Sequence, residues 1–262
     1  MLAAWLVSAS MMVATWNVNG IRARGKEVSA WAAHQRPDFL CLQELKASPE
    51  QITDATCPMP GYRSVWHGAP GGYSGVSVHA RESWGEPTRL ELPFDFETRV
   101  LGLSFADVDI LSVYAPNGGK DFDAKMRFWR EFTLWAGPRA LDAKPLVIAG
   151  DLNITRSDLD VHPDQRDSKV IGQRPDERDA FRAFLELGFV DTTRALFPAA
   201  EHMYSWWPYW NHARERNAGW RIDYVLTQAT GGLVPDDSVV QQAFGTSDHA
   251  PVLTLFGETA GL

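Results

Sequence analysis

The chain has 262 residues and a net charge of −8 at pH 7, with 45% hydrophobic and 22% charged residues. These proportions indicate a globular protein with a large core, and the acidic balance argues against non-specific nucleic-acid binding through a generally basic surface. No segment is long and apolar enough to span a bilayer, and Cys41 and Cys57 lack metal-ligand spacing. Both are expected to be free thiols in a reducing compartment, which favours a cytoplasmic protein.

The first residues are apolar and carry no basic region of the kind that opens a signal peptide. A non-native or upstream start is therefore favoured, and residues 1–11 are expected to form a disordered or non-native extension. No linker, repeat or low-complexity tract interrupts the rest of the chain. Residues 12–258 are therefore predicted to form a single domain.

Apolar runs and helical periodicity alternate along the chain. Strands are predicted at residues 13–16, 39–42, 61–66, 76–79, 145–150, 220–226 and 250–255, with a hairpin formed by residues 99–105 and 108–113. Helices are predicted at residues 26–35, 123–140 and 174–187, and a short helix begins near residue 48. Residues 155–173 form a long, charged, aperiodic loop of the kind that tends to be functional. This mixture predicts mixed sheets covered by helices.

Polar side chains stand at an end of six apolar runs or interrupt them. They are Asn17 and Asn19, Gln43 and Glu44, Tyr114 and Asn117, Asp151 and Asn153, Asp223, and finally Asp248 and His249. Each set alone is explained by turn formation, because Asn and Asp commonly close turns. Their recurrence favours strands that converge on one polar site, since catalytic groups sit on turns held by a rigid scaffold.

Six motifs resemble, in order, those of the exonuclease III family of abasic-site endonucleases, within the endonuclease/exonuclease/phosphatase superfamily. They are WNVNGIRA at 16–23, LCLQELK at 40–46, YAPNG at 114–118, GDLNI at 150–154, GWRIDY at 219–224 and SDHAP at 247–251. The motifs span nearly the whole chain, and GWRIDY is closest to the abasic-endonuclease branch. The resemblance implies an α/β fold, a four-layer α/β/β/α sandwich of two mixed β-sheets flanked by helices.

The resemblance also implies an activity. It predicts a Mg²⁺- or Mn²⁺-dependent phosphodiesterase that incises DNA 5′ to abasic sites and leaves a 3′-hydroxyl, with 3′–5′ exonuclease and 3′-end-trimming activity, in base excision repair. The expected partner is double-stranded DNA with abasic sites or blocked 3′ ends. A monomer is expected, without membrane attachment, and associated with the nucleoid if the source is bacterial.

Hydrolysis of a phosphodiester needs an activated water, neutralisation of the developing charge and help for the leaving oxygen. Under the resemblance, Asp151 orients and deprotonates the water, and Asn153 holds its geometry. His249 donates a hydrogen bond to a phosphate oxygen, and Asp223 fixes the tautomer of His249. Contacts to the phosphate or the leaving group are assigned to Tyr114 and Asn17, with a further polar contact from Asn117.

The predicted metal residues are Glu44, Asn19 and Asp248. Glu44 is a hard oxygen ligand suited to Mg²⁺, which takes one or two carboxylates and keeps several waters. Asn19 stands where family members often have Asp, and its amide is a weaker ligand. This difference puts a second metal in doubt.

An aromatic segment at residues 204–214 is interleaved with Pro, Asn, His and Arg, which favours a surface platform over a core segment. By family position, Trp206, Trp220 and Ile222 form a pocket for the abasic sugar, and Trp210 is a wedge into the duplex. Backbone phosphates are assigned to Lys120, Arg214, Arg216 and Arg221. Residues 162–172 lack the Asn-rich phosphate contacts often seen in relatives, which leaves substrate preference less constrained than the chemistry.

Two alternatives compete with this interpretation. One is a hydrolase of the same superfamily that acts on inositol phosphates or sphingolipid; the aromatic segment and GWRIDY argue against it, as does the lack of a membrane-binding stretch. The other is a non-catalytic DNA-damage binder, which predicts a missing catalytic side chain. Glu44, Asp151, Asp223 and His249 are all present.

Overall fold

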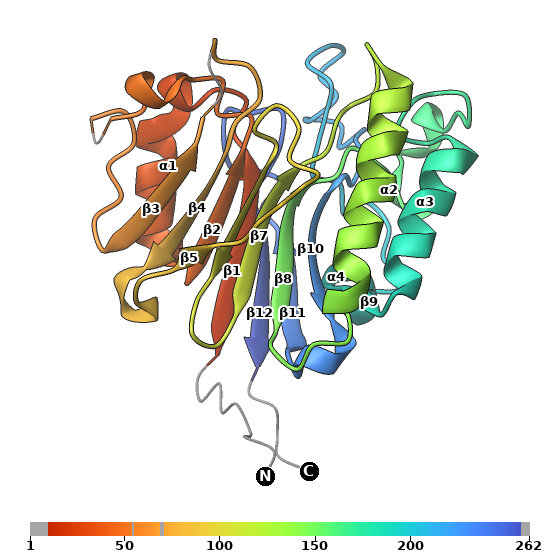
Figure 1. Cartoon of the computed structure of the whole chain (residues 1–262). Helices are drawn as coiled ribbons and strands as arrows, with labels where there is room; N and C mark the ends of the chain where they lie inside the picture. Colours follow the sequence, from red (N-terminus) through yellow and green to blue (C-terminus); the bar gives the residue numbers. More distant parts are fainter. Residues whose placement is uncertain (1–9, 54, 69–70, 258–262) are drawn as a thin grey trace.

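Two mixed sheets pack face to face, with the long helices on their outer faces (Figure 1). The computed structural model describes residues 10–53, 55–68 and 71–257. The predicted four-layer sandwich is confirmed. No helix among these residues has the length and apolar character needed to cross a membrane.

The first sheet has the strand order β11-β12-β1-β2-β4-β3. Its strands are β1 (Met11–Asn17), β2 (Phe39–Gln43), β3 (Tyr62–His67), β4 (Val76–Arg81), β11 (Val234–Val240) and β12 (Val252–Gly257). Strands β1 and β2 are parallel, and every other pair in the sheet is antiparallel.

The second sheet has the order β5-β6-β7-β8-β10-β9. Its strands are β5 (Thr88–Arg89), β6 (Val100–Ser104), β7 (Asp109–Tyr114), β8 (Leu146–Asp151), β9 (Phe189–Asp191) and β10 (Asp223–Gln228). Strands β7 and β8 are parallel, and the other pairs are antiparallel. The predicted hairpin is β6–β7.

The helices are α1 (Ile21–Gln35), α2 (Phe122–Arg139), α3 (Pro175–Glu186) and α4 (Thr192–Leu196). Short 3₁₀ turns are η1 (Pro49–Gln51), η2 (Glu82–Trp84), η3 (Asp158–Asp160), η4 (Pro163–Gln165) and η5 (Ala229–Gly231). Val28 and Trp31 of α1 pack on the outer face of the first sheet, whereas Phe132 of α2 and Phe184 of α3 cover the second sheet (Figure 1). Cys41, Val78 and other apolar side chains, among them Phe39 and Phe105, fill the space between the sheets.

Several elements differ from the predictions. The first strand begins at Met11, so the predicted domain boundary at residue 12 falls one residue inside β1, and Met11 does not belong to the extension expected at residues 1–11. Residues 1–9 of that extension lie outside the described residues. Helix α1 begins at Ile21 rather than residue 26, and β10 begins at Asp223 rather than residue 220. Strands β5, β9 and β11 and helix α4 were not predicted, because they are short or exposed and carry weak periodicity.

The topology brings the polar strand ends together. Strands β1, β2, β7 and β8 all end at the same edge of the sandwich, and the antiparallel strands β10 and β12 begin there. The register pairs Asp151 directly with Tyr114 on one side and with Asp223 on the other. Gly150 permits this close pairing, since a Cβ atom there would lie 1.9 Å from the carbonyl oxygen of Val113.

Candidate active site

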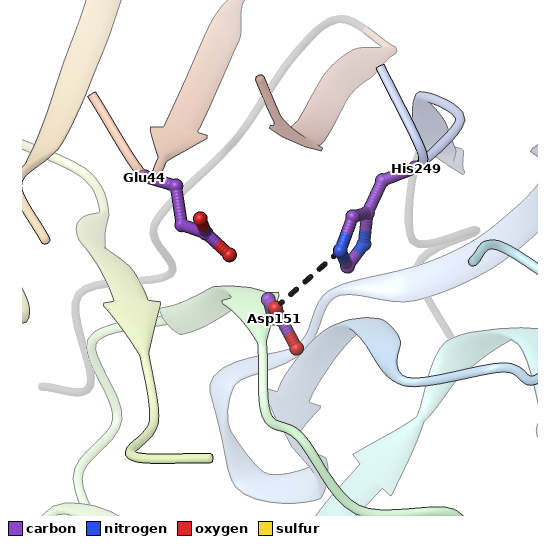
Figure 2. Close-up of side chains that lie close together, drawn as sticks. All are labelled: Glu44, Asp151 and His249. Carbon is purple, nitrogen blue, oxygen red and sulfur yellow. Dashed lines mark ion pairs between the residues drawn. The ribbon is translucent and has the colours of Figure 1, made fainter. Parts of the chain in front are cut away.

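Glu44, Asp151 and His249 converge at this edge (Figure 2). One ligand atom of each lies within 4.8 Å of the others. Glu44 follows β2, Asp151 ends β8 and His249 precedes β12, so the group joins both sheets. This confirms that these side chains, far apart in the sequence, share one place in the fold.

Asn17 lies between the two carboxylates. Its Nδ2 donates to Glu44 Oε1 at 2.8 Å and to Asp151 Oδ2 at 2.9 Å, and its Oδ1 accepts from the backbone N–H of Asn19 at 3.0 Å. The side chain is fully buried and its amide hydrogens are both engaged. Asn17 therefore holds the two carboxylates in position. This geometry corrects the prediction that Asn17 contacts the phosphate or the leaving group, because its amide hydrogens are already engaged.

A buried chain of hydrogen bonds holds the ring of His249. Its Nδ1 lies 2.9 Å from Asp223 Oδ2, which also accepts from Ser205 Oγ at 2.6 Å. Ser205 in turn accepts from the backbone N–H groups of Ile222 and Asp223 at 3.2 and 3.1 Å. The other ring nitrogen, Nε2, faces Asp151 Oδ2 at 3.8 Å. The Asp223 carboxylate thus fixes the ring orientation of His249 and leaves Nε2 toward the site.

The pKa values of Asp151 and His249 are both shifted by burial and by neighbouring charges. Loss of solvation raises the pKa of Asp151 to about 7, against the opposing effect of His249 and with support from the nearby Asp223 and Glu44 charges. Burial alone lowers the pKa of His249, but the contact with Asp223 and the charge of Asp151 raise it to about 10. The geometry therefore favours an imidazolium beside a carboxylate that is ready to exchange a proton near neutral pH.

Asn153 and Asn117 extend the site from Asp151. The backbone N–H of Asn153 donates to Asp151 Oδ1 at 2.9 Å, and its side chain donates to the carbonyl oxygen of Ala115 and accepts from Asn117. The buried Lys125 donates to the carbonyl oxygens of Asn117 at 3.1 Å and Asn153 at 2.8 Å. Asn153 therefore holds Asp151, as predicted from its position, while Lys125 fixes the backbone of both asparagines.

The donor set suits a hard divalent cation. The carboxylates of Glu44 and Asp151 converge, and carboxylate oxygens are the ligands that Mg²⁺ prefers; Glu44 also pairs with the exposed Lys46 at 2.6 Å. Hydrogen bonds from Lys46 and Asn17 outweigh the effect of burial and lower the pKa of Glu44, so it is ionised. Of the three groups, Glu44 is ionised and is not assigned to the proton transfer, so it is the residue that best fits the metal.

The other two predicted metal residues lie in a neighbouring cluster. Asn19 Nδ2 donates to Asp248 Oδ1 at 2.8 Å, and Asn19 Oδ1 accepts from Lys46 at 2.5 Å. Asp248 also accepts from Tyr209 at 3.2 Å and from the Trp206 indole at 3.1 Å. Protein donors thus occupy Asn19 and Asp248, and Asp248 lines the same cavity as Glu44 and Asp151. The metal role of Asn19 and Asp248 stays a prediction.

A small cavity of about 180 Å³ opens over the carboxylates. Trp206, Trp220 and Ile222 line it, together with Tyr114 and Ile171. The two indole rings meet edge to face at 5.2 Å, and Gln165 accepts from the Trp220 indole at 2.6 Å. The three residues predicted to form an apolar pocket therefore lie beside the catalytic groups.

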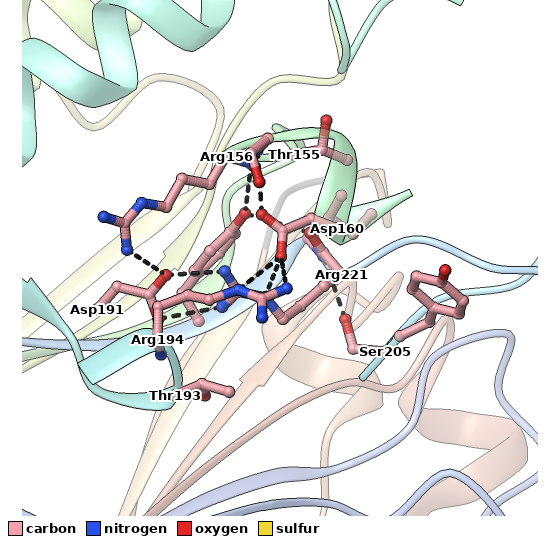
Figure 3. Close-up of polar contacts among 12 residues, drawn as sticks. Thr155, Arg156, Asp160, Asp191, Thr193, Arg194, Ser205 and Arg221 are labelled. Carbon is pink, nitrogen blue, oxygen red and sulfur yellow. Dashed lines mark hydrogen bonds and ion pairs between the residues drawn. The ribbon is translucent and has the colours of Figure 1, made fainter. Parts of the chain in front are cut away.

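Two predicted phosphate contacts are wrong. Arg221 is 1% exposed and pairs with Asp160 at 2.7 Å and Asp191 at 2.8 Å (Figure 3). Arg214 donates to the carbonyl oxygens of residues 242, 244, 245 and 247. Arg221 serves the fold, since a buried charged donor must be paired, and the half-buried Arg214 is held by backbone carbonyl oxygens.

The aromatic segment is only partly a surface platform. Tyr204 and Trp207 are 1% exposed and belong to the core, whereas Tyr209 and Trp210 are 65% and 67% exposed. Trp210 is therefore free to contact a partner, and its role as a wedge stays a prediction. Lys120 is exposed, lies over the ring of Tyr73 and also remains available for a phosphate.

Three residues of the site were missed from the sequence. Ser205 gave no signal because serine is common in loops, and Lys125 resembled an exposed residue of an amphipathic helix. Ile171 lay in the aperiodic 155–173 loop. Only the length of this loop indicated that residues 155–173 have a functional role, such as the wall of the pocket that Ile171 forms.

Comparison with known proteins agrees with this geometry. The Endonuclease/Exonuclease/phosphatase family matches residues 14–249. The exodeoxyribonuclease of Bacillus subtilis is 35% identical over 254 residues, covering 92% of this chain and 98% of the relative. Recombination repair protein 1 of Drosophila melanogaster is 33% identical over 258 residues and covers 94% of this chain, which spans only 37% of that longer relative.

Solved structures show the same fold. The chain is similar to an AP endonuclease from Archaeoglobus fulgidus, with a TM-score of 0.82 and 28% identity over 94% of this chain and 99% of that one. It is also similar to a 3′-5′ exonuclease (NExo) from Neisseria meningitidis, with a TM-score of 0.84 and 30% identity over the same shares. The chain therefore belongs to the endonuclease/exonuclease/phosphatase family and is a nuclease hydrolase of the exonuclease III type.

Proposed function

We propose that this nuclease incises DNA 5′ to abasic sites and leaves a 3′-hydroxyl, with 3′–5′ exonuclease and 3′-end-trimming activity, in base excision repair. The observation that carries the proposal is the buried Asp151 between Glu44 and the Asp223–His249 pair, directly beside a small aromatic pocket. One chain supplies all these groups, so the proposed site needs no second copy, and we propose that the protein acts as a monomer. The free, buried thiols support a cytoplasmic location.

The mechanism follows from the positions of the side chains. Asp151 orients the attacking water and accepts its proton, for which a pKa of about 7 is well matched. His249, held by Asp223, donates from Nε2 to a phosphate oxygen and stabilises the negative charge that develops there. Glu44 would hold a Mg²⁺ or Mn²⁺ ion, which when bound neutralises phosphate charge and assists the leaving oxygen.

The pocket supplies the substrate preference. A cavity of about 180 Å³ lined by Trp206, Trp220 and Ile222 has room for a deoxyribose that has lost its base. An intact nucleotide is larger and carries polar base edges that these apolar walls cannot satisfy. The pocket therefore supports selection of the abasic sugar after it leaves the duplex stack.

The test is incision of a duplex with one tetrahydrofuran abasic analogue, in Mg²⁺ and then in EDTA, with the cut end mapped. Metal-dependent cleavage just 5′ to the analogue, leaving a 3′-hydroxyl, is expected. Binding without cleavage would favour a damage-binding protein instead. No binding to the lesion would redirect the search to phosphate esters outside DNA.

A further inference from the structure

The indole ring of Trp220 bounds one side of the catalytic pocket, whose volume is about 180 Å³. The backbone of Trp220 is fixed, since its N–H donates to the carbonyl oxygen of Trp206 and its own carbonyl oxygen accepts from the N–H of Ser205, both at 2.9 Å. The half-buried ring can still rotate about its side-chain torsions unless other groups hold it. The groups that hold the ring therefore decide how wide the pocket is.

Gln165 in the 155–173 loop holds the polar edge of this ring. Its Oε1 accepts from the Trp220 indole N–H at 2.6 Å, and its Nε2 donates to the carbonyl oxygen of Ala218 at 2.9 Å. The reversed amide would place donor against donor and acceptor against acceptor, so these two contacts define its orientation. Gln165 is itself placed by η4, where its N–H donates to the carbonyl oxygen of His162 at 2.9 Å.

Gly172, from the same loop, packs against the opposite edge of the ring. A Cβ atom at this position would lie 3.0 Å from Cζ3 of Trp220, and the φ of +93° also favours glycine. The N–H of Gly172 donates to Glu177 at 2.7 Å, and its carbonyl oxygen accepts from the N–H of Thr155 at 2.8 Å. The 155–173 loop therefore contacts Trp220 on both edges of the indole.

Gln173 joins the two parts of the loop that contact the ring. It is 1% exposed, its Nε2 donates to the carbonyl oxygen of Gln165 at 3.0 Å, and its Oε1 accepts from the N–H of Asp167 at 3.0 Å. Because Gly172 blocks the opposite edge, Trp220 can turn only by giving up its hydrogen bond to Gln165. An indole N–H that loses its acceptor inside a protein is costly, so the ring stays in place.

We propose that Gln165 is a specificity-determining residue that acts through Trp220. By fixing the indole, it keeps the pocket at the size of a sugar without a base. A nucleotide that keeps its base enters only if Trp206 or Trp220 moves, whereas an abasic sugar needs no movement. Gln165 thus sets the ratio between incision at abasic sites and exonucleolytic removal of undamaged nucleotides. The inference rests on the proposed function, which supplies both activities.

Gln165→Met tests the contact, because methionine has a similar length but lacks the carbonyl acceptor. Values of kcat and KM are measured on a duplex with one tetrahydrofuran analogue and on a duplex with an undamaged recessed 3′ end. The ratio of kcat/KM between the abasic and the undamaged substrate should fall by about 10-fold, mainly because the undamaged substrate reacts faster. An unchanged ratio in the folded variant, or an equal loss on both substrates, would overturn the proposal.

Asp164→Asn is the matched control at the neighbouring position. The side chain of Asp164 is 81% exposed and lies in the same 3₁₀ turn η4 as Gln165. This variant should keep the wild-type ratio between the two substrates. A change as large as that in Gln165→Met would assign the effect to the turn and would overturn the role of the Gln165 side chain.

A double-variant cycle with Trp220→Phe shows whether Gln165 acts through the indole. Phenylalanine keeps an aromatic ring but lacks the N–H, so Gln165→Met should change the ratio little further when it is added to Trp220→Phe. A full effect of Gln165→Met in that background would show that Gln165 acts through another contact, which would contradict the proposal.

Hydrogen exchange of the indole N–H is a readout that does not depend on activity. In protein with isotope-labelled tryptophan, the signal of Trp220 is identified by its absence from Trp220→Phe. Its exchange should be several-fold faster in Gln165→Met and unchanged in Asp164→Asn, and equal protection in all three proteins would overturn the contact. Incision by the wild type with an unchanged ratio in Gln165→Met counts against Gln165 alone. Absence of incision by the wild type counts against the proposed function and removes this inference with it.

Discussion

At the scale of single residues, the pKa values of two neighbouring buried groups rise for different reasons. Asp151 loses solvation and its pKa rises to about 7, while the carboxylates around His249 raise the pKa of that imidazole to about 10. Neither shift is visible in the sequence, which shows only an Asp and a His far apart. The pairing of a weakly acidic carboxyl with an imidazolium is produced by their enclosure in one site.

Replacement of Asp151 tests its assignment as the base. Asp151→Asn keeps the shape and the hydrogen bond from the backbone of Asn153 but cannot accept a proton, so the single-turnover rate should fall by about 10²–10⁴-fold. Thermal unfolding serves as the control and should show a folded variant. A near-normal rate in the folded variant would mean that another group activates the water.

At the scale of single elements, the aromatic segment at residues 204–214 is divided between the core, the catalytic pocket and the surface. Trp207 anchors it in the core, Trp206 forms a wall of the catalytic pocket, and Trp210 points to solvent. Three tryptophans within five positions thus have three environments. Composition predicted a binding surface here, but the burial of each ring depends on what packs above it.

Trp206 should contribute to discrimination more than to chemistry. Trp206→Ala removes a pocket wall and the indole hydrogen bond to Asp248. The preference for an abasic duplex over an intact one should fall by about 10-fold or more, while the rate constant on the abasic duplex falls less. The test is to measure the rate constants of the variant on the abasic duplex and on the intact duplex. An equal loss on every DNA substrate would assign Trp206 a folding role.

The contact between α2 and α3 contains a buried ion pair. Lys125 and Glu177 are both fully buried and in contact. Lys125→Met leaves an unpaired carboxylate and should lower the free energy of unfolding by about 3–5 kcal/mol in urea titrations. The double variant Lys125→Met/Glu177→Gln keeps the acceptor for the backbone of Gly172 and should recover much of this loss. A double variant as unstable as the single one would show that the hydrogen bonds of Lys125, not its charge, matter.

At the scale of the whole molecule, a network of ion pairs attaches the 155–173 loop to the rest of the fold. Asp160 in this loop accepts from Arg194 of α4 and from Arg221, and Arg221 also pairs with Asp191 at the end of β9 (Figure 3). The network joins segments separated by more than sixty positions. It holds the loop that supplies Ile171 and Gln165 around the catalytic pocket.

This network predicts acid sensitivity. Burial raises the pKa of Asp160, but the opposite effect of Arg221 and Arg194 is larger. The pKa of Asp160 therefore lies below its ordinary value of 3.8. Because the folded pKa is depressed, the stabilisation is complete above about pH 4 and is lost as the pH falls through the folded value. Asp160→Asn should therefore cost about 3–5 kcal/mol at pH 7 and progressively less below pH 4.

Urea unfolding between pH 3 and pH 7 measures this difference. Asp158→Asn is the matched control two positions away, since its side chain is 65% exposed and its pair with Arg178 should contribute at most about 1 kcal/mol. A gap between the wild type and Asp160→Asn that does not change with pH would rule out the carboxylate charge as the cause.

The major elements and the order of the motifs could be predicted from the sequence. Periodicity located the major strands and three long helices, and polar residues at strand ends identified most of the site, because these signals depend on near neighbours in the chain. The resemblance added the fold and the chemistry. Short exposed elements such as β5 and β11 were lost, since they carry too few periodic positions.

Which charged side chains are paired and which are exposed could be learned only from the folded structure. Arg221 and Lys120 look alike in the sequence, yet Arg221 is enclosed by Asp160 and Asp191 whereas Lys120 lies at an open cavity. Asn17 was assigned to the substrate, but it bridges Glu44 and Asp151, the latter 134 positions away. Ion pairing, pKa and cavity shape arise from such distant contacts, so they become defined only when the two sheets pack together.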